Sequence, residues 1–231
     1  NGWALFSRLH SRVSPVARTI GGAARLLPAF AAILLTACAA VPPLDSEQRA
    51  RAPLYEQRLA RLSVVESWAL EGRLAVSDAA EGGSGQLSWR QHDGSSRMDF
   101  HGALGRGAWR LVADASGAEL EFADGTLHRA RSIDSLVRRH VGWDVPVEAL
   151  AWWVRGLAAP GRVQQRLLDE EGRLSELRQN GWNIEFGRYG PVSGLGGGVT
   201  MPLRMTARQA DRTVKLAIRR WELPDADGTI D

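Results

Sequence analysis

The sequence predicts an α+β domain built on one large antiparallel sheet. One observation is a series of short segments in which apolar and polar residues alternate, the period of strands that bury one face. A second is the order of the elements: a helix, about six strands, two helices and about four strands. A third is that the helices are amphipathic and can cover the apolar face of the sheet. A curved sheet under a lid of small helices leaves room for a cavity, although periodicity alone does not distinguish a cavity from a filled core.

The first 37 residues differ in composition from the rest of the chain. They contain four arginines and no acidic residue, and residues 26–37 (LLPAFAAILLTA) are almost wholly apolar. A basic region followed by about a dozen apolar residues is the layout of a secretory signal peptide. The apolar run is shorter than the roughly 20 residues that a membrane-spanning helix needs. We therefore assign residues 1–37 to a signal peptide.

Cys38 is the only cysteine of the chain, and it follows this apolar run directly. Leu35-Thr36-Ala37-Cys38 resembles the lipobox of bacterial lipoproteins. The resemblance implies a diacylglycerol on the Cys38 sulfur, cleavage before Cys38 and acylation of the new amine, and these chains together give stable anchoring. The alternative is a buried structural cysteine; an intramolecular disulfide is excluded. Ala39, where aspartate would favour the inner membrane, favours the outer membrane, with the protein facing the periplasm.

Removal of the predicted leader changes the charge of the chain. The formal net charge is +3, and loss of the four leader arginines brings it to −1. A nucleic-acid-binding protein needs a basic face, and nothing in the sequence indicates one. The remaining length fits one domain after a tether.

Residues 38–53 are expected to form the lipidated N-terminus and a linker, because AAVPPLDSEQRARAP is small, polar and proline-containing. Apolar residues then recur at helical spacing, which predicts an amphipathic helix over about residues 47–65. The globular domain is assigned to residues 54–223 and a flexible tail to residues 224–231.

The first half of the domain has the pattern of an antiparallel meander. WALEGRLAV (68–76) alternates as a strand with one apolar face, and the glycine-rich residues 81–85 are predicted to form a turn. HDG (92–94) and DG (124–125) are further turn signals. The other strands are marked by pairs of inward apolar residues: Leu87 and Trp89, Met98 and Phe100, Trp109 and Leu111, Leu120 and Phe122, with a sixth strand around Leu127.

Two short helices are predicted to interrupt the strands. Residues 132–142 have Ser132 as the N-cap and Gly142 as the stop, and residues 146–156 have Pro146 in the first turn. Alternation resumes in four later segments, and the glycine-rich SGLGGG (193–198) reads as a hairpin loop. These strands are expected over residues 174–179, 182–186, 203–207 and 214–221.

The sequence predicts no catalytic residue and no metal site. The four histidines after residue 38 are scattered, without the spacing of metal ligands, and each is interpreted as a surface or capping residue. No G-x-S-x-G elbow, P-loop or dinucleotide-binding motif occurs. An enzyme is therefore not predicted.

Tryptophan is the conspicuous residue of the domain, with eight of the nine lying after Cys38. Each can simply fill the core, or several can line a pocket for an apolar ligand. Trp152 and Trp153 are adjacent on a helix, so at least one is expected near an interface or a cavity mouth. Alternation and helix faces select the candidate cavity-lining residues, and a one-residue slip would reverse the strand assignments: Trp89, Phe100, Leu111, Phe122, Leu150, Trp153 and Trp182.

HGALGRG (101–107) forms the predicted loop between the third and fourth strands. Leu104 lies in the middle of this loop, with Ala103 as its only apolar neighbour. A lone apolar residue on a loop usually has no special role, and it can also fold back onto the core.

The order of several segments resembles the LolB family of outer-membrane lipoproteins, which receive other lipoproteins from the periplasmic carrier LolA. The resemblance runs from about Trp68 to Leu223, together with the lipobox. The segments that carry it are GRLAV (72–76), ALGRG (103–107), PVEALAWWVRGL (146–157), RQNGWNIEF (178–186), MPLRM (201–205) and VKLAIRRWEL (214–223).

The resemblance implies an incomplete antiparallel β-barrel covered by a helical lid and enclosing an apolar cavity. It implies a monomer that takes the acyl chains of a client from the LolA–lipoprotein complex and releases them into the inner leaflet of the outer membrane. No cofactor beyond the lipid on Cys38 is implied. The family's protruding loop leucine matches Leu104, which makes Leu104, Ala103 and Gly105 the expected membrane-insertion loop. Ala103 departs from the proline that the family often has there, which makes the loop less rigid.

Two other classes of function compete with this one. A lipoprotein that scaffolds envelope assemblies would have a packed core and no cavity large enough for an acyl chain. An envelope hydrolase would need convergent titratable groups, which the sequence does not show.

Overall fold

The computed structural model describes residues 46–79, 82–103 and 107–225. The described residues all belong to one compact unit with a continuous apolar core, as a domain that folds on its own requires. The predicted signal peptide, Cys38, Leu104 and Gly105 lie outside the described residues.

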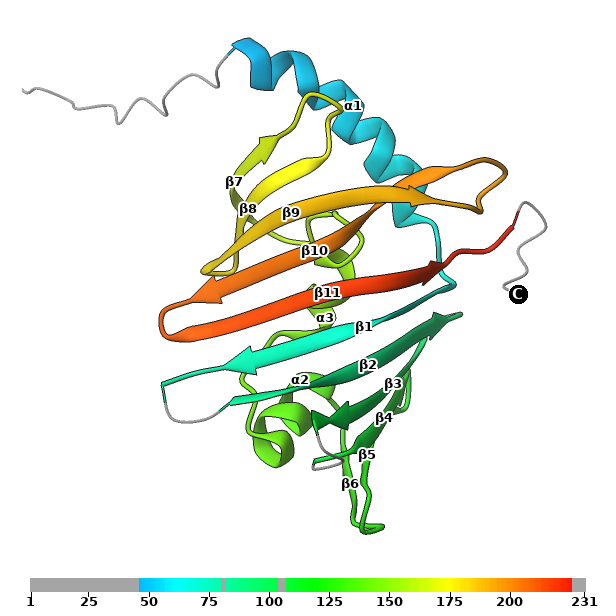
Figure 1. Cartoon of the computed structure of the whole chain (residues 1–231), viewed down its shortest axis with the longest axis vertical. Coiled ribbons are helices and arrows are strands. Elements are labelled where there is room, and N and C mark those ends of the chain that lie inside the picture. The colour runs from blue at the N-terminus through cyan, green and yellow to red at the C-terminus, as the bar shows by residue number, and fades with distance from the viewer. Residues whose placement is uncertain (1–45, 80–81, 104–106, 226–231) are drawn as a thin grey trace, which may run out of the picture. The chain divides into compact units, whose positions relative to one another are not determined.

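The domain is built on one antiparallel sheet of eleven strands, in the order β6-β5-β4-β3-β2-β1-β11-β10-β9-β8-β7 (Figure 1). The first and last strands of the chain pair at the centre, and β6 and β7 form separate edges, so the sheet curves without closing. The strands are β1 (Trp68–Ser77), β2 (Gly82–His92), β3 (Ser95–Gly102), β4 (Trp109–Asp114), β5 (Gly117–Phe122), β6 (Leu127–Ala130), β7 (Val163–Leu168), β8 (Leu174–Gln179), β9 (Trp182–Val192), β10 (Val199–Gln209) and β11 (Arg212–Glu222).

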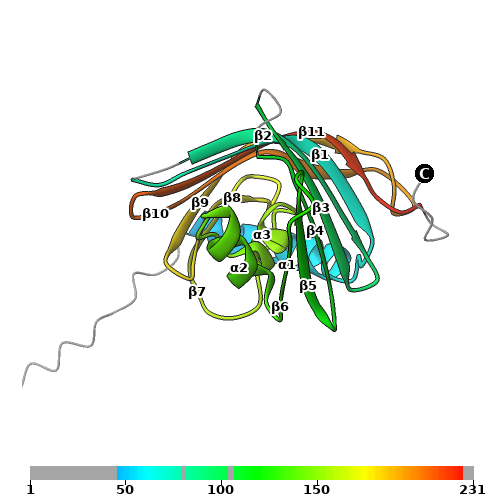
Figure 2. The same ribbon diagram turned by 90° about the horizontal axis from the view of Figure 1, so that it is seen from below.

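The helices lie on the concave side of this sheet (Figure 2). They are α1 (Ser46–Ser63), α2 (Ile133–Leu136), which continues as the π-helical turn η2 (Val137–Val141), and α3 (Val147–Trp153). We call the segment from α2 to α3 the lid. The Ser132 side chain accepts a hydrogen bond from the Ser135 N–H, and Gly142 ends η2 with φ 82°, so both predicted helix boundaries are confirmed.

The predicted fold class, an α+β domain with an incomplete barrel under helices, is confirmed, but the turn assigned to residues 81–85 is wrong in part. Gly82–Gly85 already belong to β2. A Cβ at Gly85 would lie 2.2 Å from the His101 carbonyl oxygen, and one at Gly83 would lie 2.9 Å from the Trp143 ring. These glycines are therefore explained by close packing inside a strand, not by a turn.

Strand β7 was not among the predicted strands, so the sheet has eleven strands instead of about ten. Its sequence, VQQRLL, does not alternate cleanly. It forms an edge, and its pairing with β8 shifts register twice, so a strict apolar face is not required of it.

The core fills the concave side of the sheet. Trp68, Trp89 and Trp221 come from the three neighbouring strands β1, β2 and β11, and the ring centroid of Trp68 lies 5.2 Å from that of Trp89 and 5.8 Å from that of Trp221. Offset or edge-to-face contacts of this kind add to the large area that each ring buries.

Helix α1 is fixed to the domain by polar side chains that reach backbone carbonyls. Arg58 donates to the Thr200 carbonyl at 2.8 Å and to the Arg155 carbonyl at 3.1 Å, and Gln48 donates to Leu168 at 3.1 Å. The helix begins at Ser46 and contains Pro53, so it crosses the expected domain boundary at residue 54.

Arg155 is buried just after α3 and connects the lid to α1. It donates to the carbonyls of Ala151, Leu62 and Val65 at 3.0, 3.0 and 3.2 Å. Burial lowers the pKa of Arg155 to about 10, which leaves the guanidinium charged at neutral pH.

Candidate apolar binding site

An apolar interior lies between the lid and the concave face of the sheet. Its volume is about 20 Å³, little more than a single water needs. All of its lining side chains are apolar: Leu74, Val76, Leu87, Trp89, Met98, Trp109, Val137, Trp143, Val145, Val147, Leu150 and Val214. The cavity that the resemblance implied is therefore nearly filled by its own lining, and in this structure it is too small to hold an acyl chain.

The residues of this interior come from regular elements whose periodicity turns them inward. Strands β1 and β2 contribute alternate side chains, such as Leu74 and Val76 from β1, and helix α3 contributes Val147 and Leu150 from one face. Because no lining side chain is charged or polar, the interior suits a ligand that makes no hydrogen bonds.

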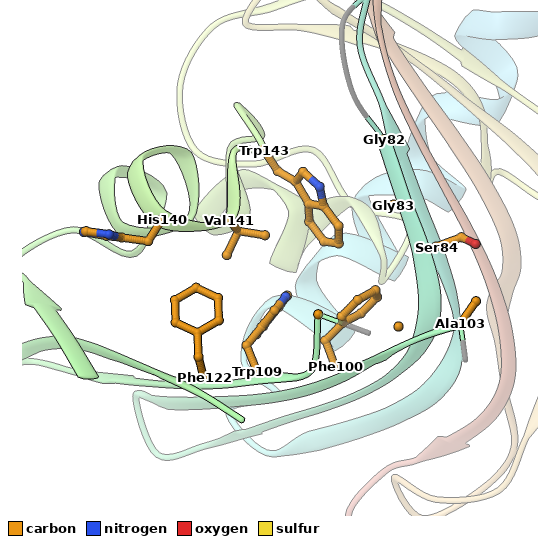
Figure 3. Close-up of a pocket in the computed structure, with 12 residues that line it drawn as sticks. Gly82, Gly83, Ser84, Phe100, Ala103, Trp109, Phe122, His140, Val141 and Trp143 are labelled. Atoms are coloured by element: carbon orange, nitrogen blue, oxygen red, sulfur yellow. The ribbon is translucent and has the colours of Figure 1, made fainter. Parts of the chain in front are cut away.

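A larger pocket, the mouth, lies at the end of the sheet where β3 is joined to β4. Its volume is about 410 Å³. Ala103 and Gly107, which flank the undescribed residues 104–106, both line it. The full lining is Gly82, Gly83, Ser84, Phe100, Gly102, Ala103, Gly107, Trp109, Phe122, His140, Val141 and Trp143 (Figure 3).

Three aromatic rings separate the mouth from the interior, and we call them the aromatic gate: Phe100, Trp109 and Trp143. Phe100 stacks on Trp109 with centroids 5.2 Å apart, and Trp143 meets these rings edge-on at 5.1 and 6.0 Å. Figure 3 shows Trp143 reaching from the lid toward the other two rings on the sheet. Trp109 and Trp143 line both the mouth and the interior.

A third pocket, the distal groove, lies at the opposite end of the strands, beside the β2–β3 and β4–β5 hairpins. Its volume is about 270 Å³, and it shares Trp89 and Val147 with the interior. Its lining is Trp89, Gln91, Gly94, Ser96, Ala113, Asp114, Gly117, Ala118, Arg131, Ile133, Val147, Glu148, Ala151 and Trp152.

The structure distributes the candidate cavity-lining residues over these spaces and the core. Phe100 and Phe122 line the mouth, and Trp89 and Leu150 line the interior. The other three, Leu111, Trp153 and Trp182, are buried in the core and line none of the three spaces. A role for the seven in ligand binding stays a prediction.

Sequence reasoning did not select Trp143 as a site residue. It lies between η2 and α3, in a connecting segment where neither a helical nor a strand period assigns an inward side. The only signal in the sequence was the residue type, a large aromatic residue. In the structure the Trp143 ring packs against Gly83, where a Cβ would lie only 2.9 Å from it.

Two histidines that were interpreted as separate surface residues lie together at the edge of the mouth. The rings of His128 and His140 stack with centroids 3.7 Å apart. Desolvation, and then the charges of His128 and Arg139, lowers the pKa of His140 below its ordinary value of 6.5. In the described parts of the chain, no three His, Cys, Asp or Glu side chains cluster as metal ligands would.

This depressed pKa predicts a loss of stability in acid. The unfolded chain takes up the His140 proton at a higher pH than the folded chain does. Protonation of His140 therefore leaves the free energy of unfolding unchanged well above pH 6.5 and lowers it as the pH falls from 6.5 toward the lower pKa of the folded state. The melting temperature of wild type is expected to fall more than that of His140→Gln between about pH 8 and pH 5.5. Parallel melting curves for the two proteins over this range would contradict the expectation.

An open half-barrel with an apolar interior beneath a helical lid defines a binding protein for apolar ligands. A comparison with known families makes the assignment specific: the family described as "Outer membrane lipoprotein LolB" matches residues 66–221. The chain belongs to the LolB family, as its segments indicated, and the predicted outer-membrane localisation is confirmed by this membership.

Curated relatives extend the match over most of the chain. The outer-membrane lipoprotein LolB of Pseudomonas aeruginosa strain PAO1 is 34% identical over 197 residues, which cover 85% of this chain and 94% of the relative. The LolB proteins of Stutzerimonas stutzeri (33%; 85% and 94% covered) and Alkalilimnicola ehrlichii (34%; 86% and 96% covered) are similar to it at the same level.

Among solved structures, a LolA superfamily protein from Nitrosomonas europaea aligns over 77% of this chain and 94% of its own, with a TM-score of 0.46 and 8% identity. In the described part of the chain, no helix combines the length and the apolar character that crossing a membrane requires.

Proposed function

We propose that this protein accepts lipoproteins from the periplasmic carrier LolA by binding their acyl chains, and inserts them into the outer membrane. The observation that carries the proposal is the interior between lid and sheet, whose lining is apolar throughout. Membership of the LolB family supports it and does not favour the alternative of a scaffolding lipoprotein.

The physical task is to keep acyl chains out of water during transfer. Each methylene that leaves an apolar environment loses about 0.8 kcal/mol, so a client cannot cross an aqueous compartment with its chains exposed. An apolar interior replaces burial in the membrane by burial in protein. Transfer then follows the difference in affinity between donor and acceptor, and no covalent step is needed.

The nearly filled interior requires a movement before a chain can enter. At its far end the lid is held by polar contacts: Trp153 Nε1 donates to Gln179 Oε1 at 3.0 Å, and Arg155, just after α3, donates to the carbonyls of Leu62 and Val65 at 3.0 and 3.2 Å. At the mouth the lid meets the sheet through the apolar ring of Trp143 and through the Arg212–Asp144 ion pair, which is partly exposed. This asymmetry supports opening at the aromatic gate while the α3 end stays in place.

The membrane-anchoring part of the proposal rests on the sequence. Cys38 is proposed as the lipidated residue, since Leu35-Thr36-Ala37-Cys38 resembles a lipobox. Residues 103–105 are proposed as the insertion loop, and the described Ala103 borders the mouth through which cargo would pass.

A transfer assay tests the proposal directly. Residues 39–231, which contain the compact unit, are mixed with a LolA–lipoprotein complex, and the distribution of the client is measured by pull-down. The client is expected to move to this protein. A client that stays on LolA, with the acceptor shown to be folded by circular dichroism, would remove the proposed function and favour a scaffold.

Leu150→Gln is expected to weaken client uptake by roughly tenfold or more. Leu150 is 5% exposed and lines the interior, so an amide there would face the acyl chain without a partner, at a cost of about 1–3 kcal/mol. Val112→Gln is the matched control, because Val112 is 40% exposed on β4. Equal uptake by the two variants would show that the interior is not the binding site.

A further inference from the structure

The mouth, the interior and the distal groove form one row of spaces beneath the lid. The mouth shares Trp109 and Trp143 with the interior, and the interior shares Trp89 and Val147 with the distal groove. The mouth and the groove lie at opposite ends of the strands, because β3 connects to β4 at one end and β4 to β5 at the other. An acyl chain long enough to pass through the interior would therefore reach the groove.

The groove exists because the side chains of β4 and β5 become smaller toward that end. The cross-strand pairs on the concave face are Trp109 with Phe122, then Leu111 with Leu120, then Ala113 with Ala118. Leu111 and Leu120 are fully buried and fill the space above them, whereas the two alanines leave it open and line the groove. The floor of the groove is thus this alanine pair, beside Ser96 of β3, whose hydroxyl accepts a hydrogen bond from Trp89 Nε1 at 2.9 Å, and Gln91 of β2.

The opposite wall comes from the lid and ends at Trp152. Val147, Ala151 and Trp152 of α3 all line the groove. The guanidinium carbon of Arg155 lies 4.8 Å from the centroid of the Trp152 ring, and Arg155 is itself held by three backbone carbonyls. This cation–π contact fixes the half-buried indole as a boundary of the groove. Beyond the apolar wall the rim is polar, with Asp114, Arg131 and Glu148.

We propose that the methyl end of a bound acyl chain occupies the distal groove, and that the Ala113–Ala118 pair and Trp152 set the longest chain that fits. The inference rests on the proposed function. The ligand class is an unbranched saturated acyl chain, which a client lipoprotein or a free fatty acid could supply. The polar head of the chain stays at the mouth, which is the larger of the two end spaces.

Chain-length selectivity provides the test. Residues 39–231 are loaded with a fluorescent fatty acid, which saturated fatty acids of about 10 to 18 carbons then displace. For wild type, affinity is expected to rise by about fourfold per methylene until the groove is full, and then to level off. Ala113→Leu fills the groove and is expected to weaken binding of the longest acids roughly tenfold, with the shortest acids unchanged. Trp152→Ala is expected to move the limit in the opposite direction, toward longer chains.

Ser88→Leu is the matched control, because it adds the same kind of bulk to an exposed position on the convex side of β2. The same length limit in wild type and in both groove variants would overturn the inference while leaving the proposed function intact. A wild-type protein that binds no fatty acid and takes no client from LolA would overturn both. Client transfer by Ala113→Leu separates the two ligand sources: a fall assigns the groove to client lipid, and unchanged transfer assigns it to free fatty acids.

Discussion

Replacement of Gln179 by leucine is expected to lower the free energy of unfolding by about 3 kcal/mol. Gln179 is fully buried in β8, and its amide satisfies three groups of the chain. Its Oε1 accepts from Trp153 Nε1 at 3.0 Å and from the Ala159 N–H at 2.9 Å, and its Nε2 donates to the Ala159 carbonyl at 2.6 Å. Leucine keeps the volume but leaves these buried groups unpaired, at about 1–3 kcal/mol each, which the added apolar burial offsets in part.

Urea unfolding followed by tryptophan fluorescence measures this difference. The midpoint is expected to fall without a change in slope, because the surface exposed on unfolding stays the same. Gln86→Leu is the control, since Gln86 is exposed on β2 and its replacement should shift stability by less than about 0.5 kcal/mol. Equal midpoints for the two variants would show that the Gln179 amide contributes nothing to holding the lid.

The strands that could be predicted from the sequence are those in which one face is buried and the other is exposed to solvent. In β1 and β4, buried and exposed residues alternate over most of the length, and this is the signal that periodicity detects. Strand β7 lacks it because an edge strand with an irregular register has no strict inner face. Gly82–Gly85 misled the prediction for a different reason: a glycine needed for close approach looks the same in sequence as one needed for a turn.

The apolar nature of the candidate site could be predicted from the sequence, but only some of the residues that line it could. Its apolar nature followed from the tryptophans and the alternation of the strands. Trp143 of the aromatic gate and the buried Gln179, which bonds the α3 end of the lid, could not be predicted, because the partners of each lie far away in sequence. Gln179 meets Ala159 and Trp153 only after the lid folds back onto β8, and no local pattern encodes that meeting.

Trp143 and Gln179 also mark the two ends of the lid, which are held by different kinds of contact. Polar bonds at the α3 end are directional and costly to break when buried, so they hold that end in one position. The hydrophobic contribution of the ring contacts at the aromatic gate is non-directional, and the geometric preference of aromatic pairs adds only about 0.5–1.5 kcal/mol. An acyl chain can therefore replace one apolar neighbour by another at a small net cost. The arrangement suits a carrier that must open for cargo without losing its fold.

Leu104→Glu is expected to abolish most delivery to membranes while leaving uptake from LolA intact. Leu104 is proposed as the insertion residue of the loop, and the nearest described residues on either side, Ala103 and Gly107, border the mouth. A leucine entering the bilayer is favourable, whereas a carboxylate is unfavourable by up to about 3 kcal/mol at the membrane centre. A fraction of that difference is enough for a tenfold loss, since about 1.4 kcal/mol corresponds to a factor of ten.

The measurement separates uptake from delivery. Client transfer from LolA is followed by pull-down, and client insertion is followed by flotation with liposomes, for the same variant. Leu54→Glu provides the control, because Leu54 is 43% exposed on α1 and carries the same change of charge away from the mouth. Loss of delivery with normal uptake in Leu104→Glu alone would assign the insertion step to the loop. Parallel loss in both variants would instead point to net charge, because an added negative charge anywhere on the domain would then be enough to keep it from the membrane surface.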